Sequence, residues 1–143
     1  MYGSLKWEKQ EEDENGLIVV REFLYKGNLD QNGKFTGYGS LKTDKGCYTG
    51  YFIDGKKHGK GDFKFANDCR YEGDYFENEK HGTGTLYKKN GNIAFSGNWK
   101  NGLPHGKGFV TNDFGDKIYL TWVNGLDEKI LPSTVDSEKF DEM

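Results

Sequence analysis

Three histidines are the residues whose type and regular spacing could bind a metal ion. His58, His81 and His105 each stand just before the first glycine of a G-x-G pair, 23 and 24 residues apart. If each histidine belongs to its own hairpin, neighbouring copies lie two strands apart, which is about 9–10 Å. A zinc ion holds its ligands at about 2 Å, so one ion cannot bridge them. We interpret the histidines as consensus residues at turn edges and predict no metal site.

The sequence shows no other arrangement that is typical of catalysis. It contains no G-x-S-x-G, Walker A or H-E-x-x-H motif and, despite its 21 glycines, no G-x-G-x-x-G. Acidic residues are scattered over turn-like stretches, and no two of them are predicted to share a pocket. We therefore predict a protein that is not an enzyme and uses no cofactor.

The composition indicates which kinds of partner and which cellular compartment to expect. The 143 residues suit one domain, with 34% hydrophobic, 30% charged and 15% aromatic residues and a net charge of -3. Without a basic footprint, nucleic acid is not expected as a partner. No apolar run approaches a membrane span, and no secretory or lipid-attachment signal is visible. Cys47 and Cys69 fit reduced thiols, so we expect a cytoplasmic protein.

A repeat with a period of 23–24 residues organises most of the chain. An aromatic residue opens each unit, at Tyr25, Tyr48, Tyr71, Phe95 and Tyr119. In the first four units a glycine follows two positions later, and a G-x-G pair comes next. These structural glycines are Gly27, Gly37, Gly39, Gly50, Gly59, Gly61, Gly73, Gly82, Gly84, Gly97, Gly106 and Gly108. "YGSLK" at 2–6 copies "YGSLK" at 38–42, which indicates that the sequence opens in the second half of a unit.

Each unit is expected to form two short strands joined by turns. Because side chains alternate across a strand, Tyr48, Gly50 and Phe52 share one face of a first strand. Gly59 and Phe63 are expected to share the same face of the second strand. The glycines leave slots in which aromatic rings can lie flat. A glycine costs roughly 0.5–1 kcal/mol relative to alanine, which burial of a ring can offset.

This pattern resembles the MORN (membrane occupation and recognition nexus) repeat. The best matches are "YTGYFIDGKKHGKGDF", "YEGDYFENEKHGTGTL" and "FSGNWKNGLPHGKGFV". Asn78 departs from the pattern at a turn glycine, and Thr121 stands in the glycine column of the fifth unit. The resemblance implies an all-β fold: an elongated, twisted antiparallel β-meander of stacked hairpins in a single sheet.

Two end segments flank the expected array. Residues 1–24 are interpreted as a half repeat plus an enlarged acidic hairpin that acts as a cap or as an added protein contact, or else as a loop insertion without a role. Residues 126–143 are interpreted as an acidic tail or a short capping helix. The array is predicted to span 25–125, with units at 25–47, 48–70, 71–94, 95–118 and, in part, 119–125.

The aromatic face suggests a binding surface, because a single sheet has no second sheet to cover it. We expect a groove that grips a helix or extended segment of another protein. Its lining is predicted to be Tyr48, Phe52, Phe63, Tyr71, Tyr75, Phe95 and Trp99. The alternative is that these rings form only a thin core, and both can hold together.

The favoured function is a non-catalytic scaffold or adaptor in a multi-subunit cytoskeletal or ciliary (axonemal) assembly. The resemblance also implies two alternatives. One is a membrane-associated adaptor for acidic phospholipids, which the dilute basic residues disfavour. The other is a regulatory subunit of a kinase or methyltransferase complex.

Overall fold

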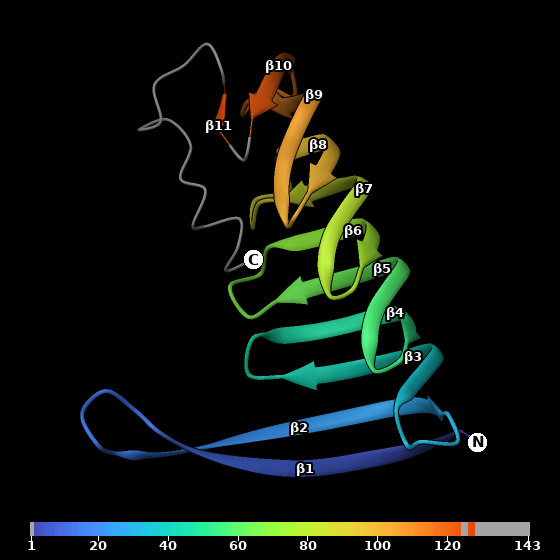
Figure 1. Ribbon diagram of the computed structural model, residues 1–143. Coiled ribbons are helices and arrows are strands. Elements are labelled where there is room, and N and C mark those ends of the chain that lie inside the picture. The colour runs from blue at the N-terminus through green and yellow to red at the C-terminus, as the bar shows by residue number, and fades with distance from the viewer. Residues whose placement is uncertain (1, 124–125, 128–143) are drawn as a thin grey trace.

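One antiparallel sheet contains every strand of the described residues, which are 2–123 and 126–127 of this computed structural model (Figure 1). The strands follow one another in chain order, which confirms the predicted all-β single-sheet meander. The option of a C-terminal helix lies outside the described residues. The strands are β1 (Tyr2–Glu12), β2 (Ile18–Leu29), β3 (Phe35–Thr43), β4 (Gly46–Ile53), β5 (Lys56–Phe65), β6 (Arg70–Phe76), β7 (Glu79–Tyr87), β8 (Ile93–Lys100), β9 (Leu103–Thr111), β10 (Lys117–Val123) and β11 (Leu126–Asp127).

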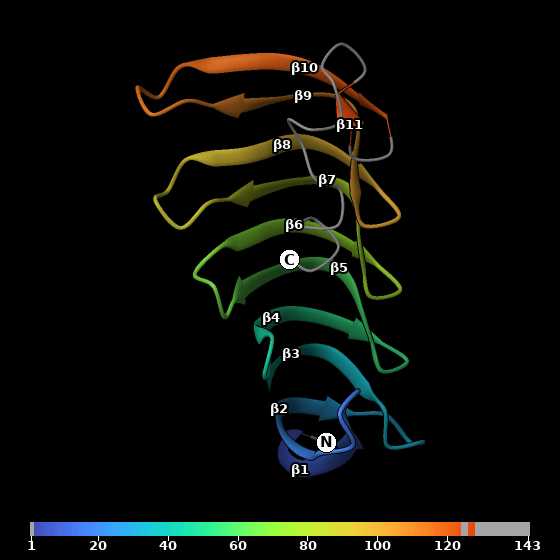
Figure 2. The same ribbon diagram turned by 90° about the vertical axis from the view of Figure 1, so that its left-hand side faces the viewer.

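The sheet is an open ladder of curved rungs. Figure 2 shows the strands stacked one above another, each bent along its length. Substantial contacts between strands join only consecutive ones, so the described chain has no crossover. Such a rod derives its stability from terms within each unit and between neighbouring units.

A continuous line of cross-strand glycine pairs runs over β1 to β9, and we call it the glycine ladder. Each member is the direct partner of the next: Gly3, Gly27, Gly39, Gly50, Gly61, Gly73, Gly84, Gly97 and Gly108. Directly opposed residues of antiparallel strands point to the same face. The ladder therefore leaves a strip without side chains along one face of the sheet.

Aromatic rings fill this strip. A Cβ built on Gly84 would lie 2.2 Å from the Tyr71 hydroxyl, and one on Gly73 would lie 2.8 Å from the same atom. Tyr71 thus lies flat on two glycines. The same arrangement recurs for the other opening rings, Tyr25, Tyr48 and Phe95. We call the face that carries these four rings the inner face.

The tyrosine hydroxyls on the ladder are hydrogen-bonded. Each donates to the backbone carbonyl three residues later, over 2.7 Å from Tyr25 and 2.8 Å from Tyr48 and Tyr71. A buried hydroxyl without a partner would be unfavourable, so these bonds let a tyrosine occupy an apolar position. Phe95 fills the fourth slot without a hydroxyl.

The first glycine of each G-x-G pair has a different role from the one we predicted. Gly37, Gly59, Gly82 and Gly106 have φ between 60° and 76°, which is the left-handed region. Between the pairs Gly50–Gly61 and Phe52–Lys57, β4 advances two residues and β5 four, so β5 bulges here. A Cβ on Gly59 would approach Tyr51, which is exposed, and not an inner-face ring. This glycine bends the strand and provides no slot.

Tight turns link each hairpin to the preceding unit. Asp54–Gly55, Glu77–Asn78 and Asn101–Gly102 each have two consecutive positive φ angles, as in a type I′ turn. Asn78 adopts the left-handed conformation at the position that glycine holds elsewhere. The second turn residue donates its amide hydrogen to the previous unit: Gly55 to Phe35, Asn78 to Lys57, and Gly102 to Lys80.

The long hairpin of β1 and β2 precedes the array. Trp7 stacks on Phe23 with ring centroids 5.2 Å apart. Arg21 joins this hairpin to the next turn by ion pairs with Glu11 and Asp44. A role of the hairpin as a cap stays a prediction.

The fifth unit starts one residue earlier than predicted. Leu120, and not Thr121, pairs with Gly108 and so stands in the glycine column. Ile118 therefore takes the position of the opening ring, while Tyr119 is 72% exposed on the other face. Trp122 then corresponds to Trp99 and is buried against Phe95. The fourth unit ends at 117 rather than 118.

Candidate functional site

The seven rings predicted to line a binding groove form the core of the described sheet. Their exposed fractions lie between 0 and 8% without any partner present. The core interpretation therefore applies to all seven: Tyr48, Phe52, Phe63, Tyr71, Tyr75, Phe95 and Trp99. Three of them, Tyr48, Phe63 and Tyr75, also line a cavity. That the rings grip a partner stays a prediction.

Edge-to-face contacts hold the rings in place. Tyr48 meets Phe52 of its own strand at 5.0 Å and Tyr75 of the next unit at 5.3 Å, with interplanar angles of 76° and 90°. Tyr71 repeats this with Tyr75 and Trp99, both at 5.2 Å. Such pairs are each worth about 0.5–1.5 kcal/mol beyond burial. A single layer of strands thereby obtains an interior.

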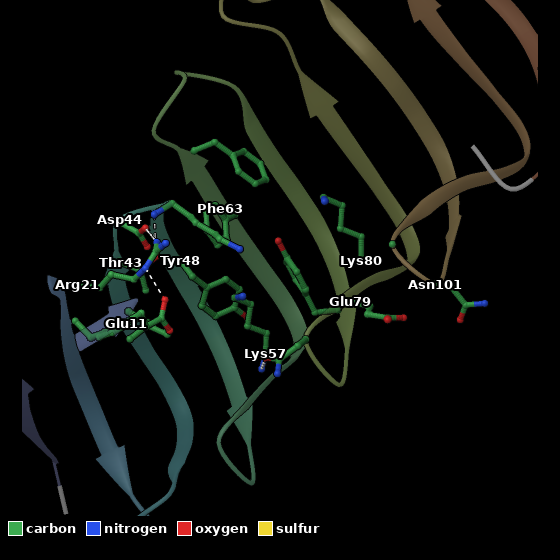
Figure 3. Close-up of a pocket in the computed structure, with 17 residues that line it drawn as sticks. Glu11, Arg21, Thr43, Asp44, Tyr48, Lys57, Phe63, Glu79, Lys80 and Asn101 are labelled. Carbon is green, nitrogen blue, oxygen red and sulfur yellow. Dashed lines mark hydrogen bonds and ion pairs between the residues drawn. The ribbon is translucent and has the colours of Figure 1, made fainter. Parts of the chain in front are cut away.

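A cavity of about 640 Å³ opens over this core on the inner face (Figure 3). Aromatic side chains from β2, β4, β5 and β6 form part of its lining. Arg21, Asp44 and Glu11 lie together at one end, and Lys57 and Lys80 lie further along the cavity on successive units. The lining thus combines apolar rings with charged groups of both signs, a composition suited to recognition of a ligand or partner.

Lys57 extends over the aromatic lining of the cavity. Its Nζ lies 5.1 Å from the ring centroid of Phe63, 5.7 Å from that of Tyr48 and 5.9 Å from that of Tyr75. The ammonium is attracted to the ring faces. Burial lowers the pKa of Lys57 to about 8, and repulsion from Lys45 adds to the effect. The side chain is therefore cationic at neutral pH, at an energetic penalty.

Lys80 occupies the equivalent position one unit later. It is the one charged residue of the described chain that is buried, with 6% of its surface exposed. Its Nζ lies 5.4–5.8 Å from the ring centroids of Phe65, Tyr71 and Trp99. The four-carbon stems of Lys57 and Lys80 cover rings that would otherwise face water.

A scan against protein-family models matches the MORN repeat at residues 48–70, 71–93 and 95–111. The chain contains three consecutive MORN repeats. The matched MORN units carry the opening rings Tyr48, Tyr71 and Phe95, so the rings on the glycine ladder coincide with the family pattern. Repeats of this family are compatible with a scaffold that binds proteins or membranes.

The outer face of the MORN sheet, opposite to the inner face, carries exposed Tyr38, Tyr51 and Phe76 together with charged side chains, many of which are paired. A hollow of about 650 Å³ follows the glycine ladder on this side. Lys60 pairs with Asp74 at 2.6 Å, and Arg70 contacts Asp62 and Glu72, each at 2.8 Å. Although burial opposes it, the hydrogen bond from Lys60 lowers the pKa of Asp74. These cations already have partners on their own sheet.

The consensus histidines do not form a metal centre. His58 and His81 lie on either side of Phe76, with ring centroids 5.3 and 5.5 Å from its ring. In the part of the chain that the structure describes, no group of three or more His, Cys, Asp or Glu could hold a metal ion. The same part contains no helix of the length and apolarity that a membrane span requires.

The residue before each bulge has a packing role that the sequence did not indicate. These residues are Phe35, Lys57, Lys80 and Pro104. Their cross-strand partners are Leu29, Phe52, Tyr75 and Trp99, in the same order. Phe35 stacks on Tyr25 with ring centroids 3.8 Å apart. Phe35, Lys57 and Lys80 lie over aromatic rings, and Pro104 is buried opposite Trp99. The only signal in the sequence is that the same position of each repeat holds a bulky residue. Where that residue is lysine, it looks like an ordinary solvated side chain.

Proposed function

We propose that this MORN protein is a non-catalytic scaffold that binds another protein on its inner face. Its place would be a subunit of a cytoskeletal or ciliary assembly in the cytoplasm. The observation that supports this most is the cavity over Tyr48, Phe63 and Tyr75, which combines aromatic surface with charged side chains. Aromatic and cationic residues are the groups that most often anchor a partner.

The buried rings change how such binding is expected to work. Because the rings hold the fold and are buried, a partner would contact mainly the side chains that surround them in the cavity. Lys45, Lys57 and Glu79 stand in this lining. A helix or an extended segment could lie along the cavity, with its own apolar side chains on the rings.

Affinity capture from the source cells with matched variants tests the proposal. Lys57→Glu changes the inner face, and Lys60→Glu makes the same change on the outer face. We expect partners identified by mass spectrometry to be lost with Lys57→Glu and retained with Lys60→Glu. Circular dichroism shows whether both variants keep the fold. Equal retention by both, or equal loss from two folded variants, would contradict binding by the inner face.

Co-sedimentation with vesicles of anionic phospholipid separates the scaffold from a membrane adaptor. We expect weak binding, because the outer-face cations near Asp62 and Asp74 are already paired. Strong binding that falls steeply with salt would favour the membrane adaptor instead.

A further inference from the structure

Two lysines of the cavity lack a carboxylate partner among the described residues. Lys57 and Lys45 both line the cavity and repel each other, and neither forms an ion pair with a described acidic residue. The carboxylates at the far end are already engaged, because Arg21 pairs with both Glu11 and Asp44. An anionic group placed beside Lys57 would relieve this repulsion.

The same chain contains a segment of complementary chemistry. Residues 128–143, which lie outside the described residues, have five acids and two lysines, so their net charge is 2 - 5 = -3. Apolar residues are interspersed with these acids, among them Ile130, Leu131, Val135 and Phe140. The segment thus offers carboxylates for the lysines and apolar side chains for the aromatic rings.

The position of β11 brings the start of this segment to the correct side of the sheet. Asp127 of β11 pairs with Trp122 of β10. Trp122 stands in the same column as Phe52, Tyr75 and Trp99. The cross-strand partners of these three residues are Lys57, Lys80 and Pro104, in the same order. The last described residue therefore lies at the sheet margin where the lysine column runs.

The segment is long enough to reach the cavity. Its 16 residues span about 53 Å when extended, at roughly 3.3 Å per residue. The distance from β11 back to β5 is six strand spacings, or about 29 Å. About nine of the 16 residues cover it, so the acids from Asp136 onward can lie beside Lys57.

We propose that the acidic segment 128–143 of the same chain occupies the inner-face cavity and places its carboxylates beside Lys45 and Lys57. Its apolar side chains then lie in the cavity beside the aromatic lining. If the proposed function holds, a partner of the inner face and the segment compete for the same cavity. This inference concerns contacts within one chain and does not need the partner to exist.

Zero-length cross-linking of the full chain with a carbodiimide tests the proposal. The reagent joins a carboxylate to an amine only where the two are in contact, and mass spectrometry identifies the joined peptides. We expect amide bonds from Asp136, Glu138, Asp141 or Glu142 to Lys45 or Lys57, in the monomer fraction. The outer-face pair Lys60–Asp74, 2.6 Å apart, is the internal positive control.

Each other result overturns the proposal. Links that appear only in a covalent dimer would show that the occupant is a second copy of the chain. Links spread evenly over exposed lysines of both faces would show an unplaced segment. A Lys60–Asp74 link without any link from the segment to Lys45 or Lys57 would show that the cavity is not occupied by it.

A charge-neutral variant of the segment provides a second measurement. In Asp136→Asn/Glu138→Gln/Asp141→Asn/Glu142→Gln the full chain length and every described residue are retained. We expect the reaction of Lys57 with trace acetic anhydride to rise roughly two- to fivefold, the effect of losing one modest ion pair. Lys60 serves as the reference amine. An unchanged ratio of Lys57 to Lys60 labelling would contradict the contact.

Discussion

Alanine at Gly84 should destabilise this protein, although alanine commonly stabilises a strand. The new Cβ would lie 2.2 Å from the Tyr71 hydroxyl oxygen and 2.5 Å from Cζ. Tyr71 cannot move aside easily, because Tyr75 and Trp99 both contact it at 5.2 Å. The φ of Gly84 is not in the left-handed region, so the clash with the ring is the only cause.

The size of the effect follows from the ring. Expulsion of a buried tyrosine exposes 150–250 Å², or roughly 4–6 kcal/mol at 25 cal/mol per Å². A partial shift in a packed core costs about 1–3 kcal/mol. We therefore expect Gly84→Ala to lower the free energy of unfolding by about 2–4 kcal/mol, since the ring is displaced but not fully expelled.

Gly3→Ala is the matched control. Gly3 belongs to the same glycine ladder, but no atom lies within 4 Å of a Cβ built on it. Alanine there should be neutral or stabilising by up to about 1 kcal/mol, because it reduces the entropy of the unfolded chain. Urea unfolding of both variants, followed by circular dichroism and tryptophan fluorescence, gives the comparison. Equal stabilities of the two variants would refute the explanation that glycines make room for rings.

Four further predictions concern the bulge, the ring hydroxyls and pH. Gly59→Ala should lower the free energy of unfolding by about 1–2 kcal/mol, because alanine is strained at a left-handed φ. Gly59→Asn should cost less, since asparagine tolerates this conformation. Thermal unfolding measures both, and equal losses would argue against strain. Tyr48→Phe should cost about 0.5–1.5 kcal/mol in urea unfolding, because the Tyr51 carbonyl loses its donor; no loss would mean that water replaces the bond. In the charge-neutral variant of segment 128–143, Lys57→Met should stabilise the protein by about 1–2 kcal/mol at pH 7, where the desolvated ammonium is charged without a carboxylate partner, since one pKa unit corresponds to about 1.4 kcal/mol. This gain should shrink between pH 8 and 10.5, because the unfolded state binds more protons there and the chain that keeps Lys57 becomes more stable as the pH rises. A constant gain would contradict the lowered pKa. Burial raises the pKa of Tyr48 and Tyr75 above that of a free tyrosine, which is about 10. The stabilisation that depends on their neutral hydroxyls is therefore complete below about pH 10 and is lost as the pH rises above it. Tyrosinate absorbance should appear together with unfolding.

The repeat and its single sheet could be predicted because the information is local. An aromatic residue and a glycine two positions apart must share a face of a strand, and the period of 23–24 residues carries that relation from unit to unit. The rings Tyr48, Tyr71 and Phe95 lie on the glycines that follow them, Gly50, Gly73 and Gly97. These features needed only strand geometry.

The two glycines of G-x-G could not be distinguished by residue type. Gly59 and Gly61 look equivalent in the sequence, yet one adopts a left-handed φ in a bulge and the other supports a ring. The start of the fifth unit was wrong for a related reason, because Tyr119 is aromatic and Leu120 replaces the glycine. Trp122 follows Trp99 by 23 residues, and this spacing indicates the correct start.

The rings predicted to line a groove are buried by long-range packing that the sequence did not reveal. Lysine is normally a solvated residue, so the sequence did not indicate that Lys57 and Lys80 cover the rings of their neighbours. The cavity likewise combines Arg21 of the N-terminal hairpin with residues of β5 and β7, and only the curved sheet brings them together. Sequence spacing alone does not determine that curvature.

The bonds between successive hairpins also determine how the rod responds to tension. Backbone hydrogen bonds run perpendicular to the strands, so they point along the axis on which the rungs are stacked. A pull on the two ends loads all the rungs in series, so the weakest rung opens first. The amides of Gly55, Asn78 and Gly102 each donate a hydrogen bond to the preceding unit and so add to the connection between successive rungs. Under load the rod should therefore lengthen in steps of one unit and close again when released.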